Sequence, residues 1–583
     1  MRIALAQLNP VVGDFEGNAK RILEAVRRAE EQAVELVLTP ELSLWGYPPR
    51  DQLLEPSRIQ QQNTVLQWLV NQLNSSVTLL VGAALPASDA RSPRLHNGVV
   101  LVNRLGWRPI AQKQLLPSYD VFDERRYFRP GDGPCLLSLP NGKRLGLTIC
   151  EDLWVDDGLQ RERLDGPDPI DQLIPEQPDL VINLAASPFD ASKPALRQQL
   201  AAAAAQRLNC PLIYLNQVGG NDELVFDGAS FVVGADGAVQ LELPVCEEHL
   251  AVWDSGHPTP VQSHGQIQPM DPLERLFRAL VLGVRDYARK CGFNKALLGL
   301  SGGIDSALVA VIASAALGNE AVSALLMPSP WSSAGSIDDA LALAERLGLQ
   351  TNTVPIAGLM EGYDQALTAP LGETPQGVTA ENLQSRIRGT LLMAVANQQG
   401  QLLLTTGNKS ELAVGYCTLY GDMNGGLAVI GDLYKTSVFA LCDWLDSDAA
   451  RSCRKELGLP TNGELVGEAI RCKPPSAELR PNQKDSDSLP DYDALDALLK
   501  ALIQERQSGP TLVAAGHDPA LVERVERLLK RAEFKRRQAA PLLKVSPQAF
   551  GSGWRVRIAA AESQPTLEKW RVARSGARLK GSP

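Results

Sequence analysis

Histidine and paired cysteines are scarce in this chain. Only five of its 583 residues are histidines, and its nine cysteines include no C-x-x-C pair. Zinc sites and disulfide frameworks need such residues at close, regular spacing, so neither is indicated. An odd number of scattered cysteines also favours a reducing compartment.

A surplus of positive charge and long apolar runs are missing as well. The 57 Lys and Arg residues stand against 67 Asp and Glu residues, and the resulting net charge of -10 argues against nucleic-acid binding. The apolar run within residues 1–8 is too short for a signal peptide, and no run reaches membrane-spanning length. We therefore expect a soluble cytoplasmic protein, without a membrane partner, that acts on small molecules.

The length and the pattern of the chain predict two α/β domains, because 583 residues are too many for one ordinary core. Residues 1–254 alternate short β-rich runs with helical ones, as in a layered α/β domain. Residues 255–270 are polar and rich in proline, which suits a linker. Residues 271–573 again alternate strand and helix patterns and are expected to form a doubly wound domain, followed by a disordered tail at residues 574–583.

A loop of small residues links the apolar run 296–298 to the apolar helical stretch 307–317. Its residues are Leu300, Ser301, Gly302, Gly303, Ile304, Asp305 and Ser306. Backbone N–H groups and the positive end of the helix converge there, the glycines allow close approach, and Asp305 could hold Mg²⁺ against phosphates. The chain has no Walker A string with its lysine, which disfavours kinase-like transfer. The alternative is an ordinary glycine-rich turn between a strand and a helix.

The S-G-G-x-D-S pattern of this loop resembles the PP-loop of the ATP pyrophosphatases. The resemblance implies a doubly wound parallel sheet and cleavage of ATP between its α and β phosphates, with activation of a carboxylate or carbonyl oxygen. Such chemistry collects negative charge on phosphates, which calls for Mg²⁺ on carboxylates and for nearby cations. We expect Asp305 and Glu411 to be the metal ligands and Lys409 to be one such cation.

Three reactive residues follow predicted strands of the first half. Glu41 comes after the strand at residues 36–39, Lys113 after 108–112 and Cys150 after 147–149. A thiol that attacks an amide needs a base and a donor to the oxyanion, and these residue types supply all three functions without histidine. Taken singly, each has a plainer interpretation as a buried cysteine, a solvated strand end or a surface charge.

The local strings around these residues resemble the nitrilase superfamily, and in particular its glutamine amidase domains. The strings are P-E-L-S-L-W-G-Y-P-P from Pro40, K-Q-L-L-P-S-Y from Lys113 and I-C-E-D-L-W from Ile149. The resemblance implies an αββα sandwich in which Glu41 is the general base, Lys113 stabilises the tetrahedral intermediate and Cys150 is the nucleophile. It further implies that Glu124 supports Lys113 and that glutamine contacts Tyr119, Ser187 and Lys193.

Strings in the second half, together with the PP-loop, resemble those of the glutamine-dependent NAD⁺ synthetases along nearly the whole chain. They start at Glu381, Thr405 and Gly415. The resemblance implies ATP binding by the PP-loop and Thr406, and deamido-NAD⁺ binding by Asn382, Glu411, Tyr416, Cys417, Thr418, Leu419 and Lys535. Lys535 lies in a basic helical run, whose ordinary interpretation is a solvated face. The loop at residues 473–490 resembles the family's mobile segment, and the family also implies a homo-oligomer.

In this family ATP adenylates deamido-NAD⁺, and ammonia released from glutamine then displaces AMP to give NAD⁺. Two alternatives remain from the residues alone. One is another glutamine-dependent PP-loop ligase that acts on a different carboxylate. The other is a carbon–nitrogen hydrolase whose second half senses ATP without consuming it. Trp331, where a tyrosine is more usual, and the loosely matching string that starts at Gly551 depart from the family pattern.

Overall fold

The computed structural model describes residues 1–73, 77–89, 91–160, 163–256 and 270–560. The expected tail at 574–583 and the last residues of the expected domain 271–573 lie outside the described residues. So does most of the expected linker 255–270, of which only Ser255, Gly256 and Met270 are described.

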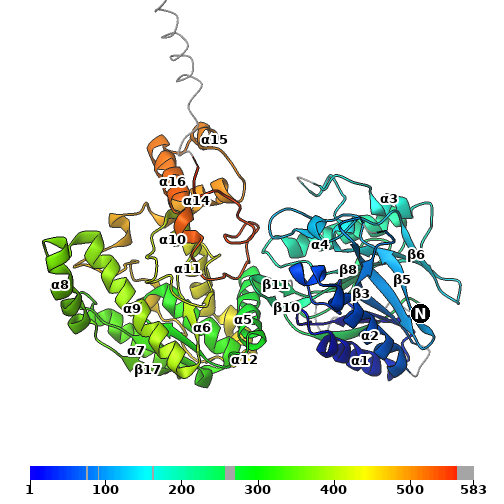
Figure 1. Cartoon of the computed structure of the whole chain (residues 1–583), viewed down its shortest axis with the longest axis horizontal. Coiled ribbons are helices and arrows are strands. Elements are labelled where there is room, and N and C mark those ends of the chain that lie inside the picture. Colours follow the sequence, from blue (N-terminus) through cyan, green and yellow to red (C-terminus); the bar gives the residue numbers. More distant parts are fainter. Residues whose placement is uncertain (74–76, 90, 161–162, 257–269, 561–583) are drawn as a thin grey trace, which may run out of the picture.

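Two six-stranded sheets face each other in the first half, between outer helices (Figure 1). One sheet has the order β14-β1-β2-β3-β4-β5, with bounds His249–Asp254, Arg2–Gln7, Leu36–Leu38, Thr78–Pro86, Leu95–Asn103 and Gly106–Gln112. The other has the order β13-β12-β9-β8-β7-β6, with bounds Val239–Glu242, Phe231–Val233, Leu212–Asn216, Leu180–Ala185, Arg144–Ile149 and Cys135–Ser138. The expected αββα sandwich is confirmed.

Side-chain alternation along the strands explains these layers. On β1, Ile3 and Leu5 join the core between the sheets, whereas Ala4 and Ala6 pack with the outer helices. Alternate residues of a strand point to opposite faces, so one short strand serves both layers. The outer helices are α1 (Phe15–Glu30) and α2 (Pro56–Gln72) on one sheet, and α3 (Pro169–Leu173) and α4 (Lys193–Leu208) on the other.

The second half is built on a five-stranded, all-parallel sheet, and the expected doubly wound fold is confirmed. Its order is β17-β16-β15-β18-β19, with bounds Gln350–Thr353, Val322–Leu326, Ala296–Gly299, Leu402–Thr405 and Leu427–Ala428. The α-helices that precede β18 in this half are α5 (Pro272–Lys290), α6 (Ile304–Leu317), α7 (Ala334–Leu347), α8 (Ala357–Leu371) and α9 (Gly377–Gln399). The strand order reverses between β15 and β18, and ligands of such sheets bind beyond the carboxyl ends of the strands at this point.

Further helices complete the second half. They are α10 (Lys409–Val414), α11 (Lys435–Leu445), α12 (Arg451–Glu456), α13 (Glu468–Arg471), α14 (Tyr492–Ile503), α15 (Gly509–Ala514), α16 (Pro519–Arg531) and α17 (Glu533–Arg536). The long loop expected at residues 473–490 is found between α13 and α14, where only one 3-10 turn, Asp485–Asp487, interrupts it.

The two halves share a polar joint and part of one hydrophobic core. The hairpin β10 (Val218–Asn221) and β11 (Leu224–Asp227) of the first half packs on α5 of the second (Figure 1). Buried Asp286 on α5 accepts hydrogen bonds from Asn9 Nδ2 at 2.6 Å and from the backbone N–H of Gly220 at 2.8 Å. The joint is therefore specific and desolvated. Among the described residues, no helix combines the length and apolar character needed to span a membrane.

Candidate active sites

Glu41 is buried between the two sheets of the first half, where hydrogen-bond donors surround its carboxylate. It follows β2 and is 1% exposed. Its Oε1 accepts hydrogen bonds from Lys113 Nζ at 2.7 Å and from Asn97 Nδ2 at 2.6 Å, while its Oε2 accepts one from the backbone N–H of Ala186 at 3.0 Å. Ala186 follows β8 of the opposite sheet, so this carboxylate bridges both sheets at their carboxyl ends.

Lys113 is fully buried and is held by two carboxylates. Its Nζ donates to Glu41 and to Glu124, each at 2.7 Å, and the hydroxyl of Tyr47 also donates to Glu124 at 2.8 Å. Burial alone would lower the pKa of Lys113, but the charges of Glu124 and Glu41 outweigh it and raise that pKa well above its usual value. Burial raises the pKa of Glu124 to about 7. Lys113 therefore remains a cation that can stabilise developing negative charge.

Cys150 begins the 3-10 turn Cys150–Leu153 directly after β7 and is 5% exposed. Its φ of 48° is left-handed, a strained conformation for a residue with a side chain, and such strain is common at reactive positions. Burial raises the pKa of the Cys150 thiol well above its usual value; the charge of Glu41 raises it further, and the charge of Lys113 opposes this. The resting group is thus a thiol that faces both a carboxylate and an ammonium group.

Of the three residues expected to contact glutamine, Tyr119 and Lys193 lie beside the same turn. The hydroxyl of Tyr119 donates to Glu151, the neighbour of Cys150, at 3.0 Å and 3.1 Å to the two carboxylate oxygens. Ser187 is buried and its Oγ accepts from Arg197 Nε at 3.3 Å. The ammonium of Lys193 lies 5.8 Å from the ring centre of Phe122 and 6.0 Å from that of Trp154. These groups offer a carboxylate, a hydroxyl and a cation to a polar substrate.

Two supporting residues of this site escaped the sequence analysis. Asn97, on β4 of the first sheet, donates to Glu41 and carries no local motif. Asp152 accepts from the backbone N–H groups of Gln114 at 2.9 Å, Leu115 at 2.8 Å and Ile149 at 3.0 Å, which ties the Lys113 segment to the Cys150 turn. Asp152 does lie within the string that starts at Ile149, so that string was the available signal.

The PP-loop of the second half lies at the strand-order reversal, between β15 and α6. Gly302 has φ 77°, and a Cβ there would lie 2.0 Å from the carbonyl oxygen of Ser336, so only glycine fits. Ser306 Oγ lies 3.1 Å from Ser301 Oγ and donates to the carbonyl of Gly303 at 3.0 Å. The loop is thus preformed with exposed Ser301 at its tip.

Lys435, which the sequence analysis missed, lies between the two carboxylates expected to hold a metal. It forms an ion pair with Asp305, and its Nζ is 3.6 Å from Glu411 Oε1. Asp305 also accepts from Asn408 Nδ2 at 2.9 Å. Burial raises the pKa of Glu411 to about 8, although the charge of Lys435 opposes this. No strand or glycine motif precedes Lys435, and only its position at the start of α11 brings it here.

The cation expected at the phosphates, Lys409, lies elsewhere, which corrects that expectation. Its side chain is fully buried on the far side of α10 and pairs with Asp432 at 2.7 Å. It also donates to Ser546 Oγ at 2.6 Å and to the carbonyl of Gln548 at 2.7 Å. Asn408 and Lys409 are adjacent, yet at the N-terminus of a helix their side chains point in different directions, so only Asn408 reaches Asp305.

The expected deamido-NAD⁺ residues form one group beside the PP-loop. Thr418 Oγ1 donates to Asn382 Oδ1 at 2.8 Å, and the carbonyl of Leu419 accepts from Arg386 Nε at 3.2 Å. Lys535 Nζ donates to the carbonyls of Gly415 at 2.8 Å and Cys417 at 2.6 Å. Lys535 therefore does not belong to a freely solvated face, because its charge is directed to the run 415–417. Thr406 follows β18 and is partly exposed.

The loop between α13 and α14 covers this group. Lys473 Nζ donates to the carbonyl of Gly302 at 3.2 Å, and Glu478 accepts from Ser336 Oγ at 2.7 Å and from Ser333 Oγ at 3.0 Å. Buried Asp485 accepts from the hydroxyl of Tyr416 at 3.2 Å. The loop thus touches the PP-loop, the start of α7 and the expected dinucleotide site. Trp331, 44% exposed, lies just before α7.

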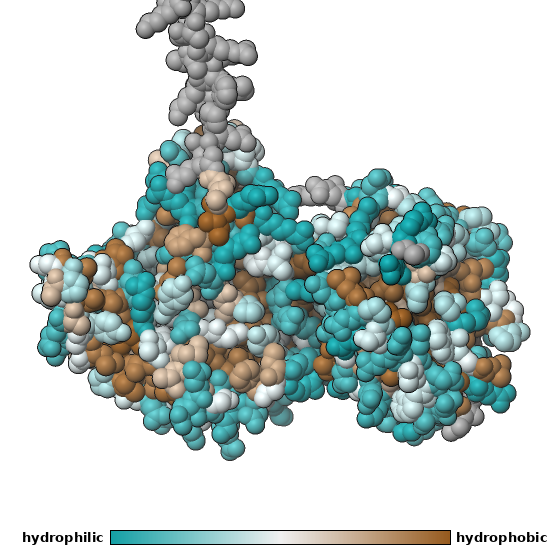
Figure 2. All heavy atoms as spheres, viewed as in Figure 1, coloured by the Kyte–Doolittle hydropathy of each residue, from teal (hydrophilic) through white to brown (hydrophobic). Residues whose placement is uncertain are grey.

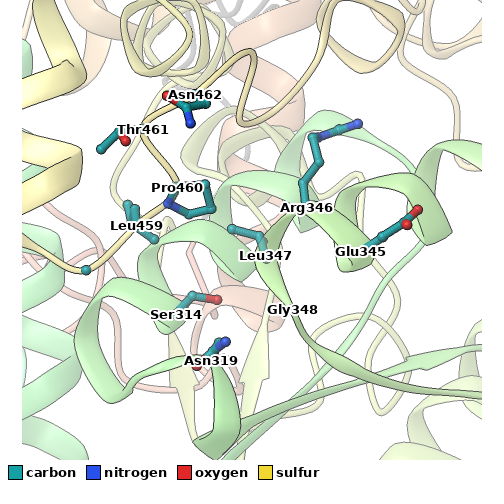
Figure 3. Close-up of a pocket in the computed structure, with 11 residues that line it drawn as sticks. Ser314, Asn319, Glu345, Arg346, Leu347, Gly348, Leu459, Pro460, Thr461 and Asn462 are labelled. Atoms are coloured by element: carbon teal, nitrogen blue, oxygen red, sulfur yellow. The ribbon is translucent and has the colours of Figure 1, made fainter.

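A hollow of about 540 Å³ lies at the opposite, amino-terminal edge of the same sheet, between the ends of α6 and α7 and residues 458–462 (Figure 3). Its lining includes Ser314, Asn319 and Arg346. None of the expected site residues lines it. Within the described part of the chain, no group of three or more His, Cys, Asp or Glu side chains is placed to hold a metal ion.

Comparisons with known proteins agree with this arrangement. The carbon–nitrogen hydrolase family matches residues 2–254, and the NAD synthase family matches residues 276–539. The glutamine-dependent NAD(+) synthetase of Synechocystis sp. is 49% identical over 564 residues, which cover 96% of this chain and 98% of the relative. That of Thermotoga maritima is 40% identical and covers 97% of this chain and 99% of the relative.

Two solved structures resemble the whole chain. The glutamine-dependent NAD⁺ synthetase of Acinetobacter baumannii, in complex with adenosine diphosphate, is 35% identical with a TM-score of 0.72, and the match covers 96% of this chain and 98% of that chain. A glutamine-dependent NAD(+) synthetase from Cytophaga hutchinsonii has a TM-score of 0.79 with the same coverages, and at 21% identity it shows the fold alone.

Proposed function

Since this chain belongs to the glutamine-dependent NAD⁺ synthetases, we propose that it makes NAD⁺ from deamido-NAD⁺, with ATP and with ammonia released from glutamine. The observation that supports the proposal is that one chain holds two buried clusters of reactive side chains: Glu41, Lys113 and Cys150 in the first half, and the PP-loop with Asp305 and Lys435 in the second. We infer an amidase domain at 1–254 and a synthetase domain at 271–573, joined by residues 255–270.

In the amidase half, Cys150 Sγ attacks the side-chain amide carbon of glutamine while Glu41 takes the thiol proton. Lys113 donates to the oxygen of the tetrahedral intermediate, which is the charge that its buried, permanently cationic ammonium suits. Collapse of the intermediate passes the proton from Glu41 to the leaving nitrogen and releases ammonia, leaving a glutamyl thioester on Cys150. Water, deprotonated by Glu41, then hydrolyses the thioester to glutamate and restores the thiol.

Tyr119, Ser187 and Lys193 are proposed to hold the glutamine. A cation and hydroxyls suit its α-carboxylate, while Glu151 beside Cys150 offers a carboxylate to its α-ammonium. Binding at these groups would direct the side-chain amide toward the Cys150 turn.

In the synthetase half, the nicotinate carboxylate of deamido-NAD⁺ attacks the α-phosphorus of ATP, and pyrophosphate leaves. Ammonia then attacks the acyl carbon of the adenylate, AMP leaves with the bonding electrons, and NAD⁺ forms. Residues Leu300 to Ser306 and Thr406 are proposed to bind ATP, because donors of the loop and of the N-terminus of α6 meet at this edge of the sheet. Lys435 lies where it can neutralise the phosphates.

The dinucleotide is proposed to bind Asn382, Glu411, the run Tyr416, Cys417, Thr418 and Leu419, and Lys535. Hydrogen bonds already join three segments of this group, at Asn382, at residues 415–418 and at Lys535. The loop at 473–490 would exclude water from the adenylate, since it spans the PP-loop and this group. That role suits an intermediate that hydrolyses readily.

We propose that Mg²⁺ binds at Asp305 and Glu411. The two carboxylates already share one cationic partner, Lys435, and two carboxylates with phosphate and water oxygens make a usual Mg²⁺ site in nucleotide enzymes. When bound, the metal would neutralise charge on the phosphates as pyrophosphate leaves.

We also propose that the enzyme is a cytoplasmic homo-oligomer. A reducing compartment suits a nucleophilic thiol, and all nine cysteines are free. For the oligomer, none of the 15 residues of α8 is buried, although Leu359 and Tyr363 are apolar and lie one helical turn apart. At the left of Figure 2, where Figure 1 places α7 to α9, apolar residues lie at the surface. A second copy of this chain would cover them.

The test is mass spectrometry of the products after incubation with ATP, Mg²⁺, deamido-NAD⁺ and glutamine labelled with ¹⁵N in its amide. We expect labelled NAD⁺ together with AMP and glutamate. Glutamate without NAD⁺ would indicate a ligase for another carboxylate, and a lack of AMP would indicate a hydrolase that only senses ATP.

A Cys150→Ala variant provides the matched control. It should lose glutamine-dependent synthesis and keep synthesis from ammonium salts, because Cys150 takes no part in adenylation. Loss of both activities would contradict the division of labour between the halves.

A further inference from the structure

One lysine of the synthetase half reaches the amidase half beside the proposed glutamine site. Lys544 follows α17 in sequence, and its segment, drawn in red in Figure 1, lies between the two halves. Its backbone N–H donates to the carbonyl of Glu223 at 2.8 Å, next to β11, and its side chain is 2% exposed. A buried ammonium group at a boundary between halves requires a specific partner.

That partner is Asp120, the residue after Tyr119. Lys544 Nζ lies 3.0 Å from Asp120 Oδ2 and also donates to the carbonyls of Ser546 at 2.7 Å and Pro547 at 2.9 Å. Asp120 adopts a left-handed backbone conformation with φ 48°, which aspartate tolerates, and a contact to its side chain from outside the turn helps to hold the turn that carries Tyr119. The ion pair supplies that contact.

Two further side chains of the same segment hold this turn. Gln548 Nε2 donates to Asp120 Oδ1 at 3.3 Å. Arg555 Nη2 donates to the carbonyls of Asp120 at 3.4 Å and Phe122 at 3.3 Å. The ring of Phe122 lies against the ammonium group of Lys193. The segment therefore contacts one neighbour of Tyr119, which is Asp120, and one neighbour of Lys193, which is Phe122.

Lys544 also acts electrostatically on Lys193. Burial lowers the pKa of Lys193; Asp190 raises it, whereas the nearby charge of Lys544 lowers it further. Lys193 is therefore a buried cation whose charged state depends on the groups around it. An anionic substrate group would be attracted by both lysines.

The segment that carries Lys544 is itself anchored beside the ATP site. Asp432 accepts from the backbone N–H groups of Val545 at 2.8 Å and Ser546 at 2.7 Å, and it pairs with Lys409. Lys409 follows Asn408, which donates to Asp305. Lys544 is thus held in position by the synthetase half and is not a loose surface side chain.

A second cation of the synthetase half acts in parallel at Ser187. Arg275 on α5 lies 3.7 Å from Asp227 Oδ2, and Arg197 donates to Asp227 Oδ1 at 2.6 Å. Arg197 Nη2 in turn donates to the carbonyl of Ser187 at 2.8 Å. The proposed glutamine site therefore connects to the other half through two carboxylates, Asp120 beside Tyr119 and Asp227 behind Ser187.

We propose that Lys544, through its ion pair with Asp120, is a positioning residue that gives the glutamine pocket of the other half its binding-competent shape. The inference rests on the proposed function, because it concerns the affinity of the amidase for glutamine. Lys544 touches neither Cys150 nor the adenylation groups, so its removal should affect glutamine binding and spare synthesis from free ammonia.

The test compares full-length Lys544→Met, Asp120→Asn and the double variant with the wild type in two assays, one with glutamine and one with ammonium chloride. Asp120→Asn keeps the shape of the side chain and tolerates the left-handed backbone, so it guards against misfolding. We expect the KM for glutamine to rise about tenfold in each variant, with ammonia-dependent kcat/KM changed less than about twofold. The double variant should be no worse than the worse single variant. Exposed Lys455, changed to Met, is the matched control.

An unchanged KM for glutamine in both single variants would overturn the proposal. Equal losses in the two assays would also overturn it, because they would mean general damage to the fold. A wild-type enzyme without glutamine-dependent synthesis would instead refute the proposed function itself, so the two failures are distinguishable.

Discussion

At the residue scale, the surroundings of Cys150, the proposed nucleophile, favour its protonated thiol. Burial and the charge of Glu41 both raise the pKa of the Cys150 thiol, and only the charge of Lys113 opposes them. A thiolate would therefore be scarce in the free enzyme at neutral pH. This arrangement limits wasteful oxidation and alkylation, because thiolates are the reactive form.

Glu41→Gln should change thiol reactivity and catalysis in opposite directions. The charge of Glu41 raises the pKa of Cys150, so its removal lowers that pKa. At a given pH the variant therefore holds more Cys150 thiolate than the wild type does. Alkylation by iodoacetamide should rise with pH without levelling off up to about pH 9 in the wild type, and the profile should move to lower pH in the variant. Glutaminase activity should nevertheless fall by at least about 100-fold, because the base is lost.

Intact-mass measurement of the alkylated protein follows this reaction, with Cys150→Ala as the blank. A profile that moves to higher pH in Glu41→Gln would show that Glu41 does not act on Cys150 through its charge.

Lys435 and Lys409 separate a binding role from a structural one. Lys435→Met should reduce adenylation by at least about 100-fold, since it removes the cation between Asp305 and Glu411.

Lys409→Met should instead leave Asp432 buried and unpaired, which costs about 3–5 kcal/mol of unfolding free energy. Pyrophosphate release and thermal unfolding measure the two effects; a stable, inactive Lys409→Met would restore Lys409 to the phosphate site.

Sequence reasoning could find residues that carry a local motif, such as Cys150 and Asp305, but it could not assign Lys409 and Lys435 correctly. Strand ends and glycine loops predict where a site lies. The direction of a side chain at the first turn of a helix depends on how that helix packs. Asn97 was missed for the same reason, because nothing near it in sequence distinguishes a strand residue that faces Glu41.

At the element scale, local rules predicted most of the architecture. Asp271 and Pro272 begin α5 as an N-cap and a first-turn proline, and Asp271 Oδ1 accepts from the backbone N–H of Leu273 at 2.8 Å. Helix α1 begins at Phe15 because Asp14 caps it. Boundaries of this kind depend on one capping hydrogen bond, which the apolar pattern does not register.

The PP-loop yields a prediction at this scale. Gly302→Ala should abolish synthesis with either nitrogen source, by at least about 100-fold, because the new Cβ would collide with the carbonyl of Ser336 and displace the loop. Glutaminase activity should persist. Gly318→Ala is the matched control: Gly318 also has positive φ and ends α6, but no atom lies within 4 Å of its Cβ position. It should cost about 1–3 kcal/mol of stability, because the Gly318 backbone (φ 84°, ψ 148°) lies in a region that side chains rarely adopt, and it should leave synthesis intact. Equal losses in both variants would refute the steric argument.

At the scale of the whole molecule, the exposed face of α8 predicts assembly. Leu359→Asp combined with Tyr363→Asp should dissociate the oligomer, because charges would replace the apolar residues at its boundary. Sedimentation velocity measures the mass. Gln365→Glu, on the opposite side of α8, adds a charge and should change nothing. A wild-type monomer would refute the assembly.

Relations between the halves were beyond the reach of the sequence. Asp120 and Lys544 are far apart along the chain, and neither belongs to a recognisable string. The string beginning at Gly551 matched its family pattern only loosely, yet Ser552 and Arg555 contact the amidase half. Contacts of this kind depend on how the surfaces of the two halves meet, which no local pattern encodes.

The ion pair between Lys544 and Asp120 constrains which amino-acid substitutions can accumulate at these two positions during evolution. A substitution at either position alone would leave a buried charge without its partner, so the path through the single change is disfavoured. The two positions should therefore vary together among related chains, with opposite charges exchanged or both lost in the same branch. An alignment of related sequences would then reveal this contact, in addition to the kinetic assays.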